Sequence, residues 1–417
     1  MKMKSLRSPR GEYPTASAPV ATTDMTHEPA TTIGLENCLD APPAVLSGAR
    51  FGLLVNQASV DYRFRYAHDL LDAALPGQLA ALFSPQHGLW SEDQDNMIET
   101  AHGHHPRLDV PVYSLYAESR KPTPESLEGL DCLVVDLQDV GTRVYTYIWT
   151  LSYCLEACGE RGIPVVVLDR PNPLGGVRVE GSRLKPSYAS FIGRAPIPML
   201  HGLTIGVMAR YLNASLGIGA AVDVVPMTGW RREMTFGDTG RPWVPPSPNL
   251  PRLEGADVYP GMVLVEGTAL SEGRGTTTPF EVIGAPFIDP LRLADALTEW
   301  KLPGFACRPL TFKPTFQKWQ DRECGGVFLH VLDDGLFHPY RTAVVLLATI
   351  RELWPEDFQW LSPPYEYETE KMPIDILSGG CELRERVDRG LTPALLDELT
   401  ALDEGGWGAE VAPHLLY

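Results

Sequence analysis

Four apolar runs with the length of buried strands each lead into side chains that bind ligands or transfer protons. The runs cover residues 51–55, 79–83, 132–137 and 164–168. In an open sheet of parallel strands, ligands bind outside the carboxyl ends of the strands, so side chains near those ends should share one edge. The side chains near those strand ends are Asn56, Gln86, His87, Asp136, Gln138, Asp139, Arg143, Asp169 and Asn172.

Carboxylates, amides, an imidazole and guanidinium groups at one edge suit acid–base chemistry on a small polar ligand. Each position also has a purely structural interpretation, because Asp and Asn cap helices and open turns. Polar residues at the ends of four successive strands favour a binding site over four unrelated turns.

The stretch 265–281 is the second place where reactive side chains gather among glycines and threonines. Glycine lets backbone N–H groups approach a ligand closely, and an arginine can clamp a carboxylate or phosphate with two hydrogen bonds. The alternative is a polar hairpin with one internal Arg–Glu pair. The residues concerned are Glu266, Glu272, Arg274, Thr276 and Glu281.

No pattern in the chain predicts a cofactor. A G-x-x-x-x-G-K-[ST] phosphate loop is missing, and Gly217-Ile-Gly219 lacks the third glycine of a dinucleotide fingerprint. A G-x-S-x-G nucleophile elbow is missing as well.

Three imidazoles at His102, His104 and His105 suggest Zn²⁺ or Ni²⁺ binding. The neighbouring Gly103 and Pro106 favour a solvated loop instead. We therefore expect no metal site.

The apolar runs also predict the fold class. Runs of Val and Leu without alternation indicate strands buried on both faces, hence a parallel sheet between helices. We expect a disordered tail over residues 1–32, a Rossmann-like, doubly wound α/β domain over 33–250, and a smaller α+β domain over 251–417. The Pro-rich stretch 241–251, which carries Trp243 and Asn249, is either the linker or a rigid loop that shapes the site.

Composition limits the partners. The chain has 35 Lys+Arg against 53 Asp+Glu, a formal net charge of −18. A charge of this sign repels nucleic acid and anionic membranes, so we expect neither as a partner. No segment approaches the roughly 20 apolar residues that span a bilayer, and the basic N-terminus is not followed by the apolar core of a signal peptide. With seven scattered cysteines, these features predict a cytoplasmic protein with reduced thiols.

A set of long motifs, found in one order, resembles the NamZ-type exo-β-N-acetylmuramidases over about residues 34–417. The resemblance implies a Rossmann-like domain, a smaller C-terminal domain and a site in the cleft between them. It also implies hydrolysis that releases N-acetylmuramic acid from the non-reducing end of peptidoglycan fragments. The motifs occupy residues 53–57, 83–88, 111–116, 121–124, 136–147, 168–173, 243–249, 259–261, 266–268 and 270–277.

One position departs from the family pattern. The family's usual P-E-H-G motif carries its favoured catalytic Glu, and this chain has Gln86 there, followed by His87. An amide orients a ligand but does not exchange a proton as a carboxyl group does. The alternative function is therefore a non-catalytic or altered sugar-binding protein on the same scaffold.

Glycoside hydrolysis generally needs two carboxyl groups, and the motif matches favour Glu272 and Asp139. Arg274 or Arg143 is expected to hold the lactyl carboxylate of the sugar, and Tyr147 or Trp243 to stack on its ring. The remaining candidates for contact with a small carbohydrate or muropeptide are Asn56, Gln138, Asp169, Asn172, Asn249, Glu266 and Thr276.

Overall fold

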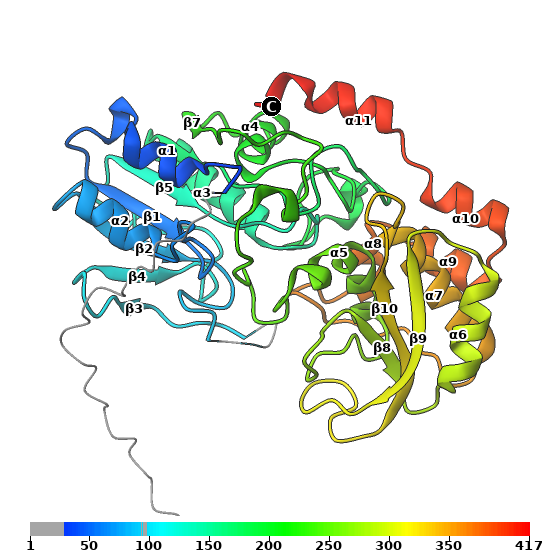
Figure 1. Cartoon of the computed structure of the whole chain (residues 1–417). Coiled ribbons are helices and arrows are strands. Elements are labelled where there is room, and N and C mark those ends of the chain that lie inside the picture. Colours follow the sequence, from blue (N-terminus) through cyan, green and yellow to red (C-terminus); the bar gives the residue numbers. More distant parts are fainter. Residues whose placement is uncertain (1–28, 93, 95–97) are drawn as a thin grey trace, which may run out of the picture.

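The computed structural model describes residues 29–92, 94 and 98–417. Most of the tail expected over residues 1–32 lies outside this range. The described chain forms a seven-stranded sheet with its helices, followed by a three-stranded sheet with helices (Figure 1). This confirms the predicted α/β fold class with a second, smaller α+β part.

The first sheet is doubly wound. Its strand order is β3-β4-β2-β1-β5-β6-β7, and every neighbouring pair is parallel except β3 with β4. The strands are β1 (Phe51–Val55), β2 (Leu79–Ser84), β3 (Gly103–His104), β4 (Pro111–Ser114), β5 (Cys132–Asp136), β6 (Val165–Leu168) and β7 (Val222–Val225).

Helices cover both faces of this sheet, which explains its unbroken apolar strands. On β5, Leu133 and Val135 join the core beneath α3 and α4, whereas Cys132 and Val134 join the core beneath α1 and α2. These helices are α1 (Gly34–Asp40), α2 (Ala67–Ala74), α3 (Tyr147–Arg161) and α4 (Ile205–Ser215).

The second sheet is antiparallel, with β10 between β8 and β9. Its strands are β8 (Val282–Ala285), β9 (Phe305–Phe312) and β10 (Cys324–Val331). The helices of this part are α5 (Leu253–Met262), α6 (Pro290–Glu299), α7 (Pro339–Leu353), α8 (Pro373–Ser378), α9 (Glu382–Arg389) and α10 (Pro393–Thr400).

The last helix, α11 (Glu404–Val411), returns to the first part of the molecule (Figure 1). Its Trp407 is buried against Tyr211 of α4 and donates a hydrogen bond to the His201 carbonyl (3.1 Å). Further on, the Tyr417 hydroxyl donates to Asp169 at the end of β6 (2.9 Å). The segment 403–417 is therefore a C-terminal strap across the first part.

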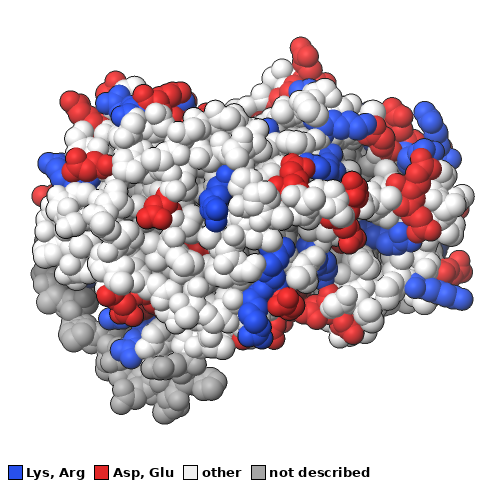
Figure 2. All heavy atoms as spheres, turned by 90° about the horizontal axis from the view of Figure 1, so that it is seen from above, with Lys and Arg blue, Asp and Glu red and all other residues white. Residues whose placement is uncertain are grey.

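Among the described residues, no helix is both long and apolar enough to cross a membrane. On the face shown in Figure 2, positive and negative side chains are interspersed.

Candidate active site

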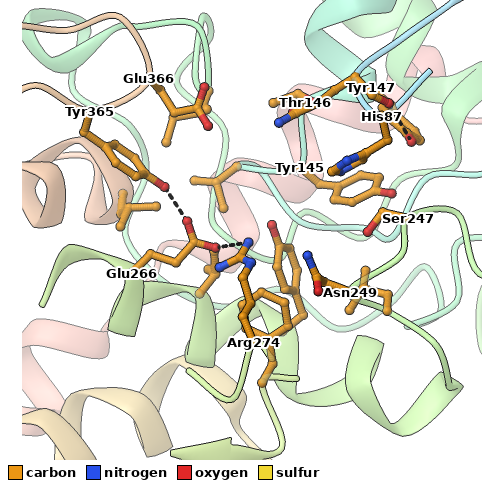
Figure 3. A pocket seen from close by; sticks show the side chains of 18 residues that line it. His87, Tyr145, Thr146, Tyr147, Ser247, Asn249, Glu266, Arg274, Tyr365 and Glu366 are labelled. Atoms are coloured by element: carbon orange, nitrogen blue, oxygen red, sulfur yellow. Dashed lines mark hydrogen bonds and ion pairs between the residues drawn. The ribbon is translucent and has the colours of Figure 1, made fainter. Parts of the chain in front are cut away.

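A pocket lies where loops of the first sheet meet the second part of the molecule (Figure 3). Loops after β2 and β5 supply one wall. The Pro-rich loop, α5 and the segments that follow it supply the other. The lining residues are Gln86, His87, Val144, Tyr145, Thr146, Tyr147, Ile192, Ser247, Asn249, Leu250, Tyr259, Val263, Glu266, Arg274, Phe280, Tyr365, Glu366 and Leu377.

The loop after β2 presents Gln86 and His87 to the pocket. His87 has a φ of 78°, a left-handed conformation that is uncommon for a residue other than glycine. The hydroxyl of Thr146 donates to the Gln86 Oε1 atom (3.0 Å). Within the described residues, the Gln86 Nε2 group has no hydrogen-bond partner, so Gln86 offers hydrogen-bond donors to the pocket.

Glu266 is held in a chain of charged groups on the opposite wall. It accepts a hydrogen bond from the Tyr365 hydroxyl (2.6 Å) and pairs with Arg274 (2.8 Å). Arg274 also pairs with Glu272 (2.8 Å), which in turn pairs with Lys318 (2.9 Å). Two carboxylates and two cations therefore balance in charge. Both terminal nitrogens of the Arg274 guanidinium are occupied, one by Glu266 and the other by Glu272.

Glu366 is the second carboxyl group of the pocket, and it lies on a tight turn. Tyr365 and Glu368 exchange backbone hydrogen bonds (both 2.9 Å) around Glu366 and Tyr367. Burial and, to a smaller extent, the charge of Glu266 raise the pKa of Glu366 to about 7 against the opposing effects of Tyr116, Arg120 and Arg274. About half of its carboxyl groups are thus protonated at pH 7.

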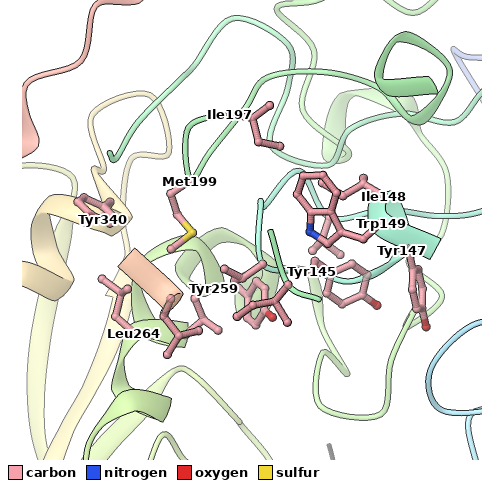
Figure 4. Packing of buried hydrophobic residues seen from close by; sticks show 14 of the residues in the cluster. Tyr145, Tyr147, Ile148, Trp149, Ile197, Met199, Tyr259, Leu264 and Tyr340 are labelled. Atoms are coloured by element: carbon pink, nitrogen blue, oxygen red, sulfur yellow. The ribbon is translucent and has the colours of Figure 1, made fainter. Parts of the chain in front are cut away.

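A row of aromatic rings forms the floor between the two walls (Figures 3 and 4). The ring of Tyr145 lies 4.6 Å from that of Tyr147 and 6.0 Å from that of Tyr259, measured between centroids. Tyr259 contacts Phe280 (4.8 Å), over which the Arg274 guanidinium lies (4.9 Å). Such a surface suits the apolar face of a pyranose ring.

The structure brings several expected site residues together in this pocket and leaves the two favoured carboxylates outside it. Those that line the pocket are Gln86, His87, Tyr147, Asn249, Glu266 and Arg274. The Tyr147 ring is buried, and its hydroxyl donates to the Pro246 carbonyl (2.8 Å), so its contact is with the Pro-rich loop.

Glu272 lies behind Arg274 and lines an adjoining cavity. Burial opposes its ionisation, but Lys318 and Arg274 outweigh that effect and lower its pKa to about 2. Asp139 is buried as well. Its Oδ2 atom accepts from the Gly141 N–H (2.8 Å) and lies 3.7 Å from the His201 Nε2 atom.

Arg143 is fully buried and donates to three backbone carbonyls, those of Ser182, Ile197 and Leu377 (2.6, 3.1 and 2.8 Å). Burial lowers its pKa to about 10. Its guanidinium joins segments of the two parts and does not line the pocket.

The remaining residues expected at the site bond chiefly to neighbouring loops. Asn56 donates to the Gln138 carbonyl (3.1 Å), and the Gln138 amide donates to the Pro171 carbonyl (2.9 Å). Asp169 accepts from the Thr204 hydroxyl (2.7 Å). Asn172 donates to the Leu203 carbonyl, Trp243 to the Leu250 carbonyl, and Thr276 to the Gly273 carbonyl (3.0, 3.2 and 2.6 Å).

Sequence reasoning missed Glu366, Tyr365, Tyr145 and Tyr259. Tyr145 and Tyr259 lie inside motifs quoted for the family resemblance, so those motifs offered a signal for them. Glu366 follows Pro363-Pro364-Tyr365 in a stretch without strand or helix periodicity, and no sequence signal singles it out.

No group of three or more His, Cys, Asp or Glu side chains in the described part of the chain is placed to hold a metal ion. The His102 Nδ1 atom instead accepts from the Ser114 N–H (3.0 Å). Glu92, which follows the Gln86 loop, accepts from the Trp90 N–H (3.1 Å) and turns back onto Gly88.

Comparisons with known proteins agree with this architecture. Models of the N- and C-terminal parts of the exo-β-N-acetylmuramidase NamZ match residues 51–254 and 257–417. The chain is 43% identical over 375 residues to the peptidoglycan β-N-acetylmuramidase NamZ of Bacillus subtilis, which covers 90% of this chain and 88% of that protein.

Two crystal structures of DUF1343 family proteins from Bacteroides fragilis are similar in fold. One has a TM-score of 0.84 and 31% identity, covering 94% of this chain and all of that chain. The other has a TM-score of 0.70 and 26% identity, covering 93% and 99%.

The fold and these relatives define the protein as a glycosidase. More narrowly, the chain belongs to the NamZ family of exo-β-N-acetylmuramidases.

Proposed function

We propose that this protein is an exo-acting glycoside hydrolase that releases N-acetylmuramic acid from the non-reducing end of peptidoglycan fragments. The observation that carries the proposal is a pair of buried carboxyl groups, Glu266 and Glu366, which line one pocket in different surroundings. The B. subtilis relative, named for activity on peptidoglycan, supports the substrate class.

In this proposal Glu366 is the general acid. With a pKa raised to about 7, it carries a proton near neutral pH and donates it to the glycosidic oxygen as the bond breaks. Glu266 is the second carboxylate, oriented by Tyr365 and Arg274. It acts either as the base that activates water or as the nucleophile at the anomeric carbon.

Proton NMR of the first sugar released distinguishes these two roles. A product with the β-configuration of the substrate assigns Glu266 as the nucleophile. A product with the inverted α-configuration assigns it as the base.

The lactyl carboxylate distinguishes N-acetylmuramic acid from N-acetylglucosamine. Arg274 is engaged by two carboxylates and Arg143 by three carbonyls. We therefore assign contact with the lactyl group to the neutral donors of the pocket, with Gln86 Nε2 first among them.

The second candidate, a sugar-binding protein without turnover, is favoured by Gln86 in place of the family's usual Glu. Mass spectrometry after incubation with MurNAc-β-1,4-GlcNAc separates the two. Release of free N-acetylmuramic acid supports the hydrolase. Binding of the disaccharide without product supports the sugar-binding protein and refutes the hydrolase.

Turnover of small, imported fragments in a reducing cytoplasm completes the proposal. All seven cysteines are free thiols, and burial raises the pKa of several of them, such as Cys38 to about 12. Thiols of this kind persist in a reducing compartment. Cell fractionation with an antibody against the protein tests the location, and recovery outside the cytoplasm would contradict it.

A further inference from the structure

The turn that carries Glu366 has an unfavourable backbone conformation. Glu366 has a φ of 45° and Tyr367 a φ of 67°. A two-residue hairpin turn with both values positive favours Asn-Gly, and other residues adopt this conformation at a cost in free energy. A strained turn persists only where its surroundings hold it, so contacts around this turn must compensate.

Those contacts come from the first part of the molecule, beyond β4. The Tyr116 hydroxyl donates to the Glu366 carboxyl group (3.2 Å). The Arg120 guanidinium lies over the rings of both Tyr116 and Tyr367, 4.2 and 4.4 Å from their centroids, and the two rings meet edge to face (6.3 Å between centroids). One arginine thus joins the loop after β4 to the turn of the second part.

This guanidinium contacts a carbonyl and one exposed carboxylate in addition to the aromatic rings. Arg120 donates to the Ala117 carbonyl, and its nearest carboxylate, the exposed Glu99, lies 3.6 Å away. Its Nε atom is buried and has no hydrogen-bond partner among the described residues. Because only 15% of the Arg120 side chain is exposed, each cation–π contact is stronger than at an open surface.

Arg120 also acts on Glu366 through its charge. Among the described residues, the charged and titratable groups that act on Glu366 include Glu266, Tyr116, Arg120 and Arg274. Arg120 favours the ionised form of Glu366, against burial and Glu266. Position and proton affinity of this carboxyl group therefore depend on the same side chain.

We propose that Arg120, in contact with the rings of Tyr116 and Tyr367, is a positioning residue that holds the 365–368 turn against the pocket and thereby sets the orientation and charge of Glu366. The proposal rests on the proposed function, in which Glu366 is the acid. Arg120 itself does not line the pocket.

The test uses two independent readouts on the full chain. The first is the titration of the Glu366 carboxyl carbon by ¹³C NMR without substrate, assigned with Glu366→Gln. The second is the pH dependence of kcat on MurNAc-β-1,4-GlcNAc. Both are measured for the wild type, Arg120→Met, Arg120→Lys, Tyr367→Leu and the control Arg308→Met. Arg308 also lies over an aromatic ring, that of Phe328 (5.3 Å), but lines no part of the site.

In Arg120→Met, Glu366 should titrate at higher pH, the basic limb of the kcat profile should move the same way, and kcat at its optimum should fall about tenfold, or about 1.4 kcal/mol. Arg120→Lys should leave the basic limb of the kcat profile near its wild-type pH. It should still lower kcat, because an ammonium does not stack on an aromatic ring as a planar guanidinium does. Tyr367 is exposed, so Tyr367→Leu should fold normally and lower kcat with the charge intact. Arg308→Met should behave as the wild type.

An unchanged Glu366 titration and pH profile in Arg120→Met, with unchanged kcat in Tyr367→Leu, would overturn the positioning role. If the titration moves in Arg120→Met but the wild type shows no turnover, the positioning role stands and the proposed hydrolase activity fails.

Discussion

Two side chains of nearly equal size, Gln86 and Glu366, face one pocket with different chemical capacities. Gln86 supplies hydrogen-bond donors, and Glu366 a carboxyl group with a pKa near 7. The absence of a carboxyl group at position 86 is therefore compatible with catalysis, because a proton donor reaches the pocket from another segment.

Replacing Glu366 with Gln should lower kcat about 10²–10⁴-fold, the usual contribution of a general acid, while disaccharide binding stays close to that of the wild type. Steady-state kinetics and isothermal titration calorimetry measure the two quantities. Glu180→Gln is the matched control, because Glu180 is another buried carboxyl group with a pKa raised to about 7 and lies outside the pocket. Equal rates for Glu366→Gln and the control would exclude Glu366 as the acid.

Gln86→Glu tests whether the family's usual residue improves this enzyme. A new carboxylate should repel the lactyl carboxylate, so we expect a higher KM for MurNAc-β-1,4-GlcNAc and no increase in kcat. The KM for a substrate without the lactyl group should change less. A large gain in kcat would contradict this expectation and favour the sugar-binding alternative for the natural sequence.

At the scale of elements, loops at strand ends build half of the site, and contacts between distant segments build the rest. Unbroken apolar runs predicted β1, β2, β5 and β6 closely, because strands buried on both faces leave that pattern. Helix α5 was not predicted, since Pro260 lies inside it and Pro-rich sequence precedes it. Glu366 was not predictable either, because its burial depends on Tyr116, 250 residues away in the chain.

The hydrogen bond from Tyr147 to the Pro246 carbonyl joins the start of α3 to the Pro-rich loop, which brings Ser247 and Asn249 to the pocket. Tyr147→Phe leaves the buried carbonyl without this donor and should cost about 1 kcal/mol of unfolding free energy. We also expect a raised KM, because the loop is less well placed. Urea unfolding and kinetics check both effects, and a variant with unchanged stability and KM would show that the loop is fixed by other contacts.

At the scale of the whole molecule, buried polar contacts join the two parts. The Glu180 carboxyl group, in the first part, accepts from the Arg341 N–H in the first turn of α7 (2.8 Å). Burial raises the pKa of Glu180 from the usual 4.5 to about 7, although the backbone N–H groups of Arg341 and Tyr340 lower it. The folded protein therefore holds a proton here that the unfolded chain releases above pH 4.5.

This difference makes stability fall as pH rises. The contribution of Glu180 to the unfolding free energy is fully present below pH 4.5 and is lost as the pH rises through 7. The loss amounts to at most about 3 kcal/mol. Urea unfolding at pH 5, 6, 7 and 8 should show a smaller decline for Glu180→Gln than for the wild type. Identical declines would show that Glu180 does not contribute.

The C-terminal strap contributes to stability at the same scale. Trp407 is 2% exposed, contacts Tyr211, and lies under the Arg183 guanidinium (5.3 Å). Trp407→Ala should lower the unfolding free energy by about 3–5 kcal/mol. Activity per folded molecule should change little, because Trp407 lines no part of the pocket. A loss below 1 kcal/mol would contradict the role of the strap.

The strap has a consequence for synthesis on the ribosome. Domains generally fold as the chain emerges, N-terminal part first, yet Trp407 and Tyr417 cover α4 and the end of β6 only after the residues that precede the strap have been made. Tyr211 and Asp169 in the first part of the molecule therefore remain uncovered until Trp407 and Tyr417 have been synthesised. A ribosome that stops before residue 403 releases a chain that lacks this cover, so protein quality control can recognise incomplete copies by that exposed surface.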